Sequence, residues 1–314
     1  MRVPRYLTAP DGARLTVRRA WPHDDGRLTF EAVEDGTGRL RAGRIDSTGD
    51  VHLAGFGEDP ALEGLADAAR PASGTLLVHR FRKRAVVRAD GAYLKLLPGA
   101  KIEVVAAAHA TAAGFAVAGG ITVPDVVARE GSMLTLSVVP GRSLHELGRV
   151  ASEPGHGTSA LEAAWSAWAE AWPRFALQHP SRGDGSATGS ADAAGRLPVF
   201  DAEAEARTTA VWVDRCLAFD ALPVPAEDLS AVAGTVRARL LTGTPDRLLL
   251  AHRDLHDKQL LVDGSGGVGM IDCDTLAVAE AALDLANLQV HLEFREAQGL
   301  LSPAGRRIGV DAVR

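Results

Sequence analysis

The sequence has only two cysteines and four lysines among its 314 residues. Cys216 and Cys273 are too few for a disulfide framework and are typical of a reducing compartment. The first residues lack the apolar stretch of a signal peptide, and no run approaches transmembrane length. The net charge of −6 has the wrong sign for general affinity to nucleic acid or an anionic membrane. We therefore expect a cytosolic protein with no nucleic-acid partner and no membrane partner.

Length and the order of local patterns predict a two-lobed α+β protein, because 314 residues exceed one ordinary compact core. Short strand-like segments separated by turn formers fill the first part of the chain. They cover residues 27–34, 40–47, 51–56, 74–81 and 92–97. An Ala-rich segment at 101–118 predicts a helix, and residues 132–139 again resemble a strand.

Helical patterns dominate after Pro140-Gly141, in residues 161–177, 201–220 and 226–241 and in a last helix near 279–294. The first of these carries three tryptophans at spacings of three and four, which is typical of a helix face packed in a core. Segments 151–160 and 179–197 are rich in Gly, Ser, Asp and Ala, and we expect loops there. We assign 1–73 to a β-rich extension, 74–139 to a β-rich N-lobe and 140–314 to a mainly helical C-lobe.

The stretch AHRDLHDKQLLVDGSGGVGMIDCD, residues 251–274, interrupts the helical part and carries most of the chemistry. Apolar runs at 248–251, 259–262 and 267–272 predict three strands, and the glycine-rich segment 263–267 between the last two is a strong turn signal. This fold-back brings Asp254 and Gln259 near Asp272. Three oxygen-bearing side chains at one place suit a hard cation such as Mg²⁺, which leaves sites open for phosphate and water.

The order of these residues resembles a known family. His252, Asp254 and Gln259 follow the pattern H-x-D-x-x-x-x-N, and residues 271–274 and 282–286 read IDCD and ALDLA. This sequence of elements is similar to that of the aminoglycoside phosphotransferases and their choline-kinase-like relatives, which share the two-lobed protein-kinase-like fold. Gln259 replaces the usual Asn, as in the maltokinase and glucosamine-kinase branch, but the acidic run that follows the metal-binding Asp in that branch is TLA here.

The resemblance implies an enzyme that moves a phosphoryl group from ATP, with Mg²⁺, to a hydroxyl of a small molecule such as an aminoglycoside, an amino sugar or another sugar. Asp254 would engage the hydroxyl and Arg253 would steady the loop, with Asp274 as its partner. Gln259 and Asp272 would bind the metal ion. Asp284 would brace the catalytic loop.

The resemblance extends upstream to the nucleotide site. Lys95, in the strand-like segment AYLKLL, would pair with the phosphates, and the alternative is an edge-strand lysine that faces solvent. Glu103 is the only acidic residue between Lys95 and Asp125, so it is the candidate partner of that lysine. Residues 136–144 resemble the family linker, in which Ser137 to Val139 would offer main-chain groups to the base. No G-x-G-x-x-G loop is present.

Three other interpretations remain open. A metallohydrolase would use His252, Asp254, His256 and Asp257 as ligands, but such sites need further ligands elsewhere in the chain. A non-catalytic nucleotide-binding regulatory protein on the same scaffold would account for Gln259, although it has no reason to keep Asp254, Asp272 and Lys95 together. A purely structural polar hairpin would explain one aspartate as a turn residue.

Overall fold

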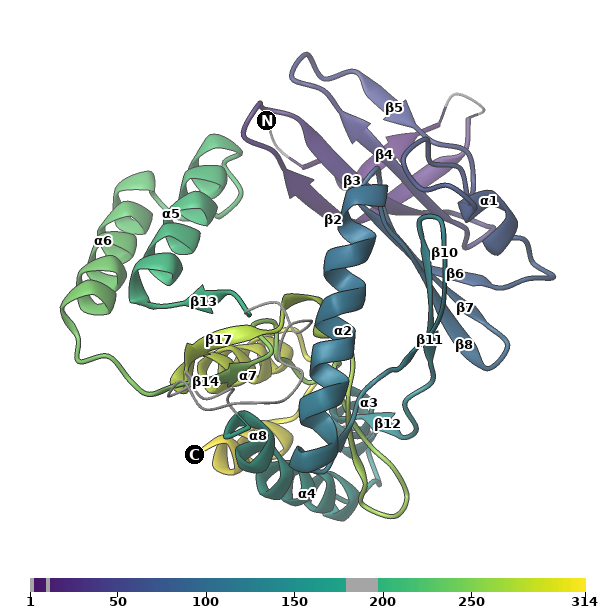
Figure 1. Ribbon diagram of the computed structural model, residues 1–314. Helices are drawn as coiled ribbons and strands as arrows, with labels where there is room; N and C mark the ends of the chain where they lie inside the picture. Colours follow the sequence, from purple (N-terminus) through teal and green to yellow (C-terminus); the bar gives the residue numbers. More distant parts are fainter. Residues whose placement is uncertain (1–2, 10–11, 179–196) are drawn as a thin grey trace, which may run out of the picture. The chain divides into compact units, whose positions relative to one another are not determined.

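The computed structural model describes residues 3–9, 12–178 and 197–314, which form two compact units (Figure 1). The units alternate along the chain. Unit 1 contains Met1–Glu103, Val126–Ser137 and Glu203–Gly243, and unit 2 contains Val104–Asp125, Val138–Ala202 and Thr244–Arg314. Unit 1 carries two antiparallel sheets and unit 2 is mainly helical with short strands, which confirms the predicted α+β class.

The first sheet of unit 1 is a meander of five antiparallel strands in chain order. They are β1 (Tyr6–Thr8), β2 (Arg14–Pro22), β3 (Leu28–Glu34), β4 (Leu40–Ile45) and β5 (Val51–Leu53). The last three agree with the segments predicted from alternation, whereas β1 and β2 were missed. Phe30 fills the centre of this sheet, and a side chain at Gly43 would collide with its ring.

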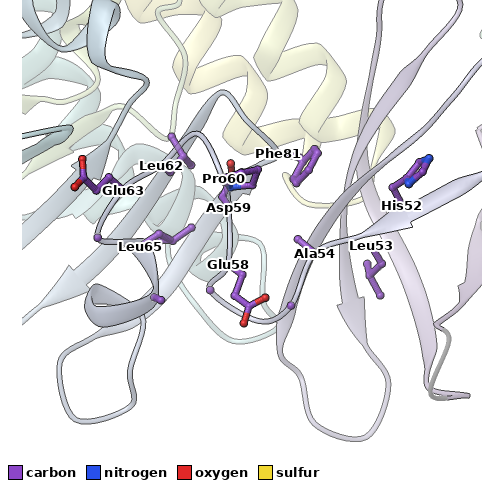
Figure 2. A pocket seen from close by; sticks show the side chains of 14 residues that line it. His52, Leu53, Ala54, Glu58, Asp59, Pro60, Leu62, Glu63, Leu65 and Phe81 are labelled. Carbon is purple, nitrogen blue, oxygen red and sulfur yellow. The ribbon is translucent and has the colours of Figure 1, made fainter.

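The second sheet of unit 1 has the strand order β10-β11-β8-β7-β6 and is antiparallel throughout. Its strands are β6 (Thr75–Arg80), β7 (Arg84–Ala89), β8 (Ala92–Leu96), β10 (Val126–Glu130) and β11 (Met133–Ser137). The short helix α1 (Leu65–Ala68) packs against it through Leu65 and Ala68. A cavity of about 540 Å³ opens between the segment after β5 and α1, where Glu58, Asp59 and Glu63 lie beside apolar residues (Figure 2).

Helix α5 (Ala202–Ala218) leads to the first sheet of unit 1. Phe219, just after the helix, is buried among the apolar residues of that sheet, and the Arg215 guanidinium donates to Asp24 at 2.9 Å. Helix α6 (Ala226–Thr242), all of whose residues are described, has no buried side chain. The loop expected at 179–197 falls almost wholly outside the described residues.

Helix α2 (Gly99–Gly119) corrects one expectation. By length and composition its segment Lys101–Gly119 is long and apolar enough to cross a membrane, so the expectation that no run approaches transmembrane length is wrong. One such helix is weak evidence of a membrane-spanning segment, since helices in the core of a protein can be equally long and apolar. Ala112 and Ala116 on α2 are buried in the core of unit 2.

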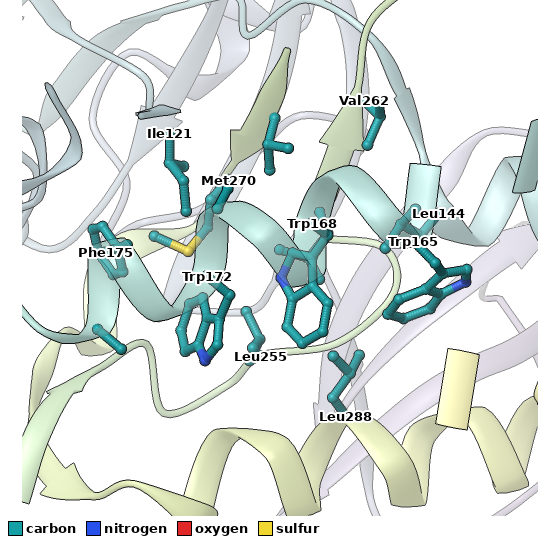
Figure 3. Close-up of a cluster of buried hydrophobic side chains, with 14 of the residues drawn as sticks. Ile121, Leu144, Trp165, Trp168, Trp172, Phe175, Leu255, Val262, Met270 and Leu288 are labelled. Atoms are coloured by element: carbon teal, nitrogen blue, oxygen red, sulfur yellow. The ribbon is translucent and has the colours of Figure 1, made fainter. Parts of the chain in front are cut away.

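The core of unit 2 is built on the tryptophan stripe of α4 (Ser159–Ala176), as the spacing predicted (Figure 3). Trp165 and Trp168 meet edge to face at 5.5 Å between ring centroids, and Trp168 stacks on Trp172. Burial of each such large side chain contributes about 2–3 kcal/mol. The helices around this core are α3 (Leu144–Ala151), α7 (Ala282–Ala297) and α8 (Pro303–Val313).

Two short sheets in unit 2 position the polar stretch 251–274. The first has the order β12 (Arg142–Ser143), β15 (Leu260–Val262), β16 (Val268–Met270) and β9 (Ile121–Thr122), and the second has the order β13 (Val199–Phe200), β17 (Ala277–Glu280) and β14 (Leu248–Ala251). The β15–β16 hairpin is the predicted one. The first residues of the last predicted helix belong instead to β17, which pairs with β14. That helix, α7, therefore begins at Ala282.

Candidate active site

The loop between β14 and β15, residues 252–259, is fixed at its start by Asp284 of α7. One carboxylate oxygen accepts from the backbone N–H of His252 at 2.6 Å and the other from that of Arg253 at 2.8 Å. Asp284 is 2% exposed, and burial raises the pKa of its carboxyl. A buried carboxylate needs such donors to offset its lost hydration. The predicted bracing role of Asp284 is confirmed.

His252 connects the loop to the end of the β16 strand. Its Nδ1 accepts from the backbone N–H of Asp254 at 3.3 Å, which leaves Nε2 to donate to the carbonyl of Ile271 at 2.9 Å. Thr275 donates its hydroxyl to the carbonyl of His252 at 2.8 Å. This pattern corresponds to one neutral tautomer of a fully buried imidazole. His252 therefore links the loop that contains Asp254 to the segment after β16 that contains Asp272.

Two residues of the predicted site have left-handed backbone. Arg253 has φ 67° and Asp272 has φ 63° and ψ 46°, a conformation that non-glycine residues adopt rarely. Such conformations cluster at active sites when the surroundings fix them. The guanidinium of Arg253 lies over the ring of Phe200, 3.1 Å from its centroid, a contact that the sequence did not indicate.

Asp254 and Gln259 lie side by side at the two ends of this loop. Nε2 of Gln259 donates to Oδ2 of Asp254 at 3.3 Å. Oε1 of the same amide is buried and has no hydrogen-bond partner among the described residues. Burial raises the pKa of Asp254, and the negative charge of Asp272 adds to this, while the bond from Gln259 opposes it. The backbone N–H of Ile271 donates to the carbonyl of Gln259, which places Gln259 next to Asp272.

The other aspartate of the loop, Asp257, has different surroundings. His145 Nδ1 lies 2.8 Å from its Oδ2, and Arg295 Nε donates to both oxygens at 3.2 and 3.3 Å. Although burial opposes it, these two partners lower the pKa of Asp257. Burial and the charge of His291 lower the pKa of His256 to about 4. Neither His145 nor Arg295 could be found from the sequence, because each is remote from Asp257 along the chain.

These contacts are unfavourable for the metallohydrolase interpretation. Asp257 is engaged in an ion pair with Arg295, and both ring nitrogens of His252 are hydrogen-bonded to backbone groups, those of Asp254 and Ile271. Across residues 3–9, 12–178 and 197–314, no group of three or more His, Cys, Asp or Glu side chains is arranged to bind a metal ion.

Lys95, in unit 1, is 4% exposed on the central strand β8, between β7 and β11. Its cross-strand neighbours are Val86 and Leu134, so the edge-strand interpretation is wrong. Glu103 on α2 forms a two-pronged ion pair with Arg129 and has a side chain that is 61% exposed. Its pairing with Lys95 stays a prediction.

The remaining predicted positions lie near the linker. Ser137 ends β11 opposite Ala92. Val139 is buried, and the absence of a side chain at Gly269 leaves room for its Cγ1. Asp274, predicted near Arg253, accepts from Nε2 of the buried His109 at 3.2 Å. His109 gave no signal in the sequence, since it is a single polar residue in an alanine-rich helix.

Residues 73–309 match the sequence profile of APH, the phosphotransferase enzyme family. The chain belongs to this family. It is a small-molecule phosphotransferase that uses ATP, and its fold is the protein-kinase-like fold of the family. No curated protein sequence matches the chain.

Several solved structures of other proteins are similar to this phosphotransferase. A type I macrolide 2′-phosphotransferase is 21% identical with a TM-score of 0.48, covering 79% of this chain and 80% of its own. The macrolide 2′-phosphotransferase MphH of Brachybacterium faecium is 18% identical with a TM-score of 0.45, and 80% and 82% of the two chains are covered. A choline/ethanolamine kinase family protein of Mesorhizobium loti is 19% identical with a TM-score of 0.45, over 78% and 72%.

Proposed function

We propose that this phosphotransferase moves the γ-phosphoryl group of ATP to a hydroxyl of a small molecule, and that Asp254 engages that hydroxyl. The observation that carries the proposal is the state of Asp254. Its carboxylate is on a loop braced by Asp284, and burial raises its pKa. A raised pKa suits a group that must accept a proton near neutral pH.

The proposed step is a displacement at the γ-phosphorus of ATP. The acceptor oxygen attacks the γ-phosphorus and forms a new O–P bond as the bond between the γ-phosphorus and its bridging oxygen breaks. ADP leaves with the electron pair of the broken bond, and the hydroxyl proton passes to Asp254. Phosphoryl transfer needs positioning and charge stabilisation more than covalent help from the protein, so a few fixed side chains suffice.

Gln259 and Asp272 are the proposed ligands of Mg²⁺. The buried Oε1 of Gln259, which has no donor among the described residues, fits this assignment because a hard cation prefers such an oxygen. The ion would neutralise charge on the phosphates when it is bound. The left-handed backbone of Asp272, two residues after β16, supports a role for that residue beyond a turn.

For the nucleotide we propose Lys95 as the phosphate partner and the main chain of Ser137 to Val139 as the contact of the base. The burial of Lys95 on a central strand supports this role, because lysine side chains are rarely buried in a protein unless a specific interaction or function keeps them there. Arg253 would hold the loop through its contact with Phe200. Glu103 remains the proposed partner of Lys95, although it pairs with Arg129 in this structure.

The proposed acceptor is an aminoglycoside, an amino sugar or another sugar. The test is ADP release with Mg-ATP across a panel of these compounds, with neutral sugars and choline-like alcohols included. Wild-type protein should release ADP with one class, and Asp254→Ala should not. The matched control is Asp311→Ala, which changes an exposed aspartate on α8 of the same unit and should keep full turnover.

Two outcomes would contradict the proposal. Undiminished turnover in the Asp254→Ala protein would remove Asp254 from the reaction. Silence of the wild-type protein across the panel, together with intact Mg-ATP binding, would favour a nucleotide-binding regulatory protein on the same scaffold.

A further inference from the structure

Unit 1 contains a second cavity, of about 300 Å³, whose walls are rich in cations. They come from the β2–β3 turn, from the facing strands β3 and β4, and from the β6–β7 turn. Its charged and polar lining side chains are His23, Arg27, Thr29, Arg44, Arg82 and Lys83. The first four lie outside residues 73–309, so this cavity depends on a part of the chain that the family match does not include.

Local acids neutralise only part of this charge. Asp25 pairs with Arg27, and Asp24 is engaged by Arg215. Among the described residues, no acidic side chain forms an ion pair with the other three cations of the cavity, which are Arg44, Arg82 and Lys83. An excess of about three positive charges is therefore left around one small space.

Arg44 is the most informative of these cations. It is half-buried on β4, opposite Thr29 of β3, and its Nε is buried with no hydrogen-bond partner among the described residues. A buried guanidinium N–H without an acceptor is costly, so an absent acceptor is the simplest explanation. Burial lowers the pKa of the nearby His23, and the positive charge of Lys83 lowers it further.

The neighbouring cavity of the same unit has the opposite character. Phe81 lines both cavities, and the one in Figure 2 is lined by Glu58, Asp59 and Glu63. There the buried Asp59 is satisfied by His79 and by the backbone N–H of Arg82. The contrast indicates that a positively charged lining is specific to the cavity at Arg44 and is not shared by the neighbouring one.

We propose that the cavity at Arg44, Arg82 and Lys83 binds a phosphate group of a small molecule. Guanidinium groups donate two hydrogen bonds to a phosphate, and a lysine adds a point charge. A volume of about 300 Å³ accommodates a phosphate ester and excludes a large ligand. This site would be separate from the residues proposed for catalysis, and the proposal does not depend on the acceptor or on turnover.

The test is equilibrium binding of pyrophosphate to the full chain, measured by calorimetry at fixed ionic strength set with sodium chloride. The double variant Arg44→Gln, Arg82→Gln should bind at least about 10-fold more weakly, because each charge-assisted bond to phosphate is strong. The matched control Arg88→Gln removes an exposed cation of β7 that lies outside the cavity and should bind as the wild type does.

A variant of Lys95 separates this site from the proposed nucleotide site. Lys95→Met should leave pyrophosphate affinity within about 2-fold, whereas loss of binding in Lys95→Met and none in the double variant would overturn the proposal. If the double variant does not fold, Lys83→Gln, at an exposed position of the turn, takes its place with an expected loss of about 3-fold or more. Wild-type affinity in that variant would equally overturn it.

Discussion

The loop of residues 252–259 contains two aspartates in opposite states. Asp254, the proposed proton acceptor, has a pKa raised by burial, and its neighbour Gln259 keeps an amide oxygen free of donors among the described residues. Asp257, only three positions on, has a pKa lowered by His145 and Arg295 despite burial. The raised pKa favours the protonated form of the first carboxyl group, and the lowered pKa favours the charged form of the second.

The comparison shows that partners, and not the residue type or burial alone, decide what an aspartate does here. Asp257 is the more deeply buried of the two, at 2% exposed, whereas Asp254 lies at an exposed position of the loop. Burial favours the neutral acid, and a cation within hydrogen-bond distance reverses that preference. The same loop thus carries the proposed proton acceptor and a charged structural residue, and variants at the two positions should have opposite effects on stability.

The largest effect is expected for Asp254→Asn. Turnover should fall by about 10²- to 10⁴-fold, the usual worth of a positioned proton acceptor. Because the folded state raises the pKa of Asp254, its ionised form costs folding free energy above the unfolded pKa, and that cost disappears in the amide. Unfolding in urea at pH 7 should therefore show equal or greater stability. A clear loss of stability would mean that Asp254 is a structural residue.

The pH dependence of wild-type turnover checks the same assignment. The active form of Asp254 is ionised, so the rate should fall as the pH drops through its raised pKa, above the ordinary value near 3.9. The Asp311→Ala control should give the same profile as the wild type. A rate that is flat down to pH 4 would be incompatible with Asp254 as the proton acceptor.

The second-largest effect is expected for Asp257, which is fixed by His145 and Arg295. Asp257→Asn should lower the free energy of unfolding by about 3 kcal/mol at pH 7, because it leaves Arg295 buried without its charged partner. The folded pKa of Asp257 is depressed, so this stabilisation is present above the unfolded pKa near 3.9 and is lost as the pH falls through the folded pKa. The difference between variant and wild type should accordingly shrink below about pH 4.

Urea titrations of both proteins at pH 7 and at acid pH provide the measurement. A difference that is constant with pH would show that the ion pair is not the source of the loss. Turnover of the folded variant should fall much less than in Asp254→Asn, since Asp257 has no proposed contact with the reacting atoms.

Local signals in the sequence were sufficient for much of the fold and for part of this loop. The turn at 263–267 joins β15 to β16 as predicted, and the tryptophan spacing identified the face of α4 that forms the core. The bracing by Asp284 followed from the order of elements in a family and is confirmed by two hydrogen bonds.

What the sequence could not provide are contacts between distant segments. His145 and Arg295 meet Asp257 across 112 and 38 positions, and no periodicity links such residues. The pairing of β14 with β17 was missed for the same reason, because β17 is a short strand placed directly before a helix pattern. The ion pair between Glu103 and Arg129 is a further contact between distant segments. In the sequence, Glu103 could only be suggested as a partner of Lys95, because no other acidic residue lies between Lys95 and Asp125.

The smallest effect, and the sharpest test of the proposed site at Asp254, is Gln259→Asn, which restores the residue usual in this family. The shorter side chain withdraws the amide by one methylene, so it should lose the bond from Nε2 to Asp254 and move its oxygen away from the buried position. If that oxygen binds Mg²⁺, the Mg²⁺ concentration for half-maximal rate should rise roughly 3- to 10-fold, about 1 kcal/mol. Gln289→Asn, on the exposed face of α7, is the matched control. An unchanged Mg²⁺ dependence would show that the amide oxygen of Gln259 does not bind the ion and that this residue only hydrogen-bonds Asp254. The length of the side chain at position 259 can change the affinity for Mg²⁺ only if that side chain is a ligand.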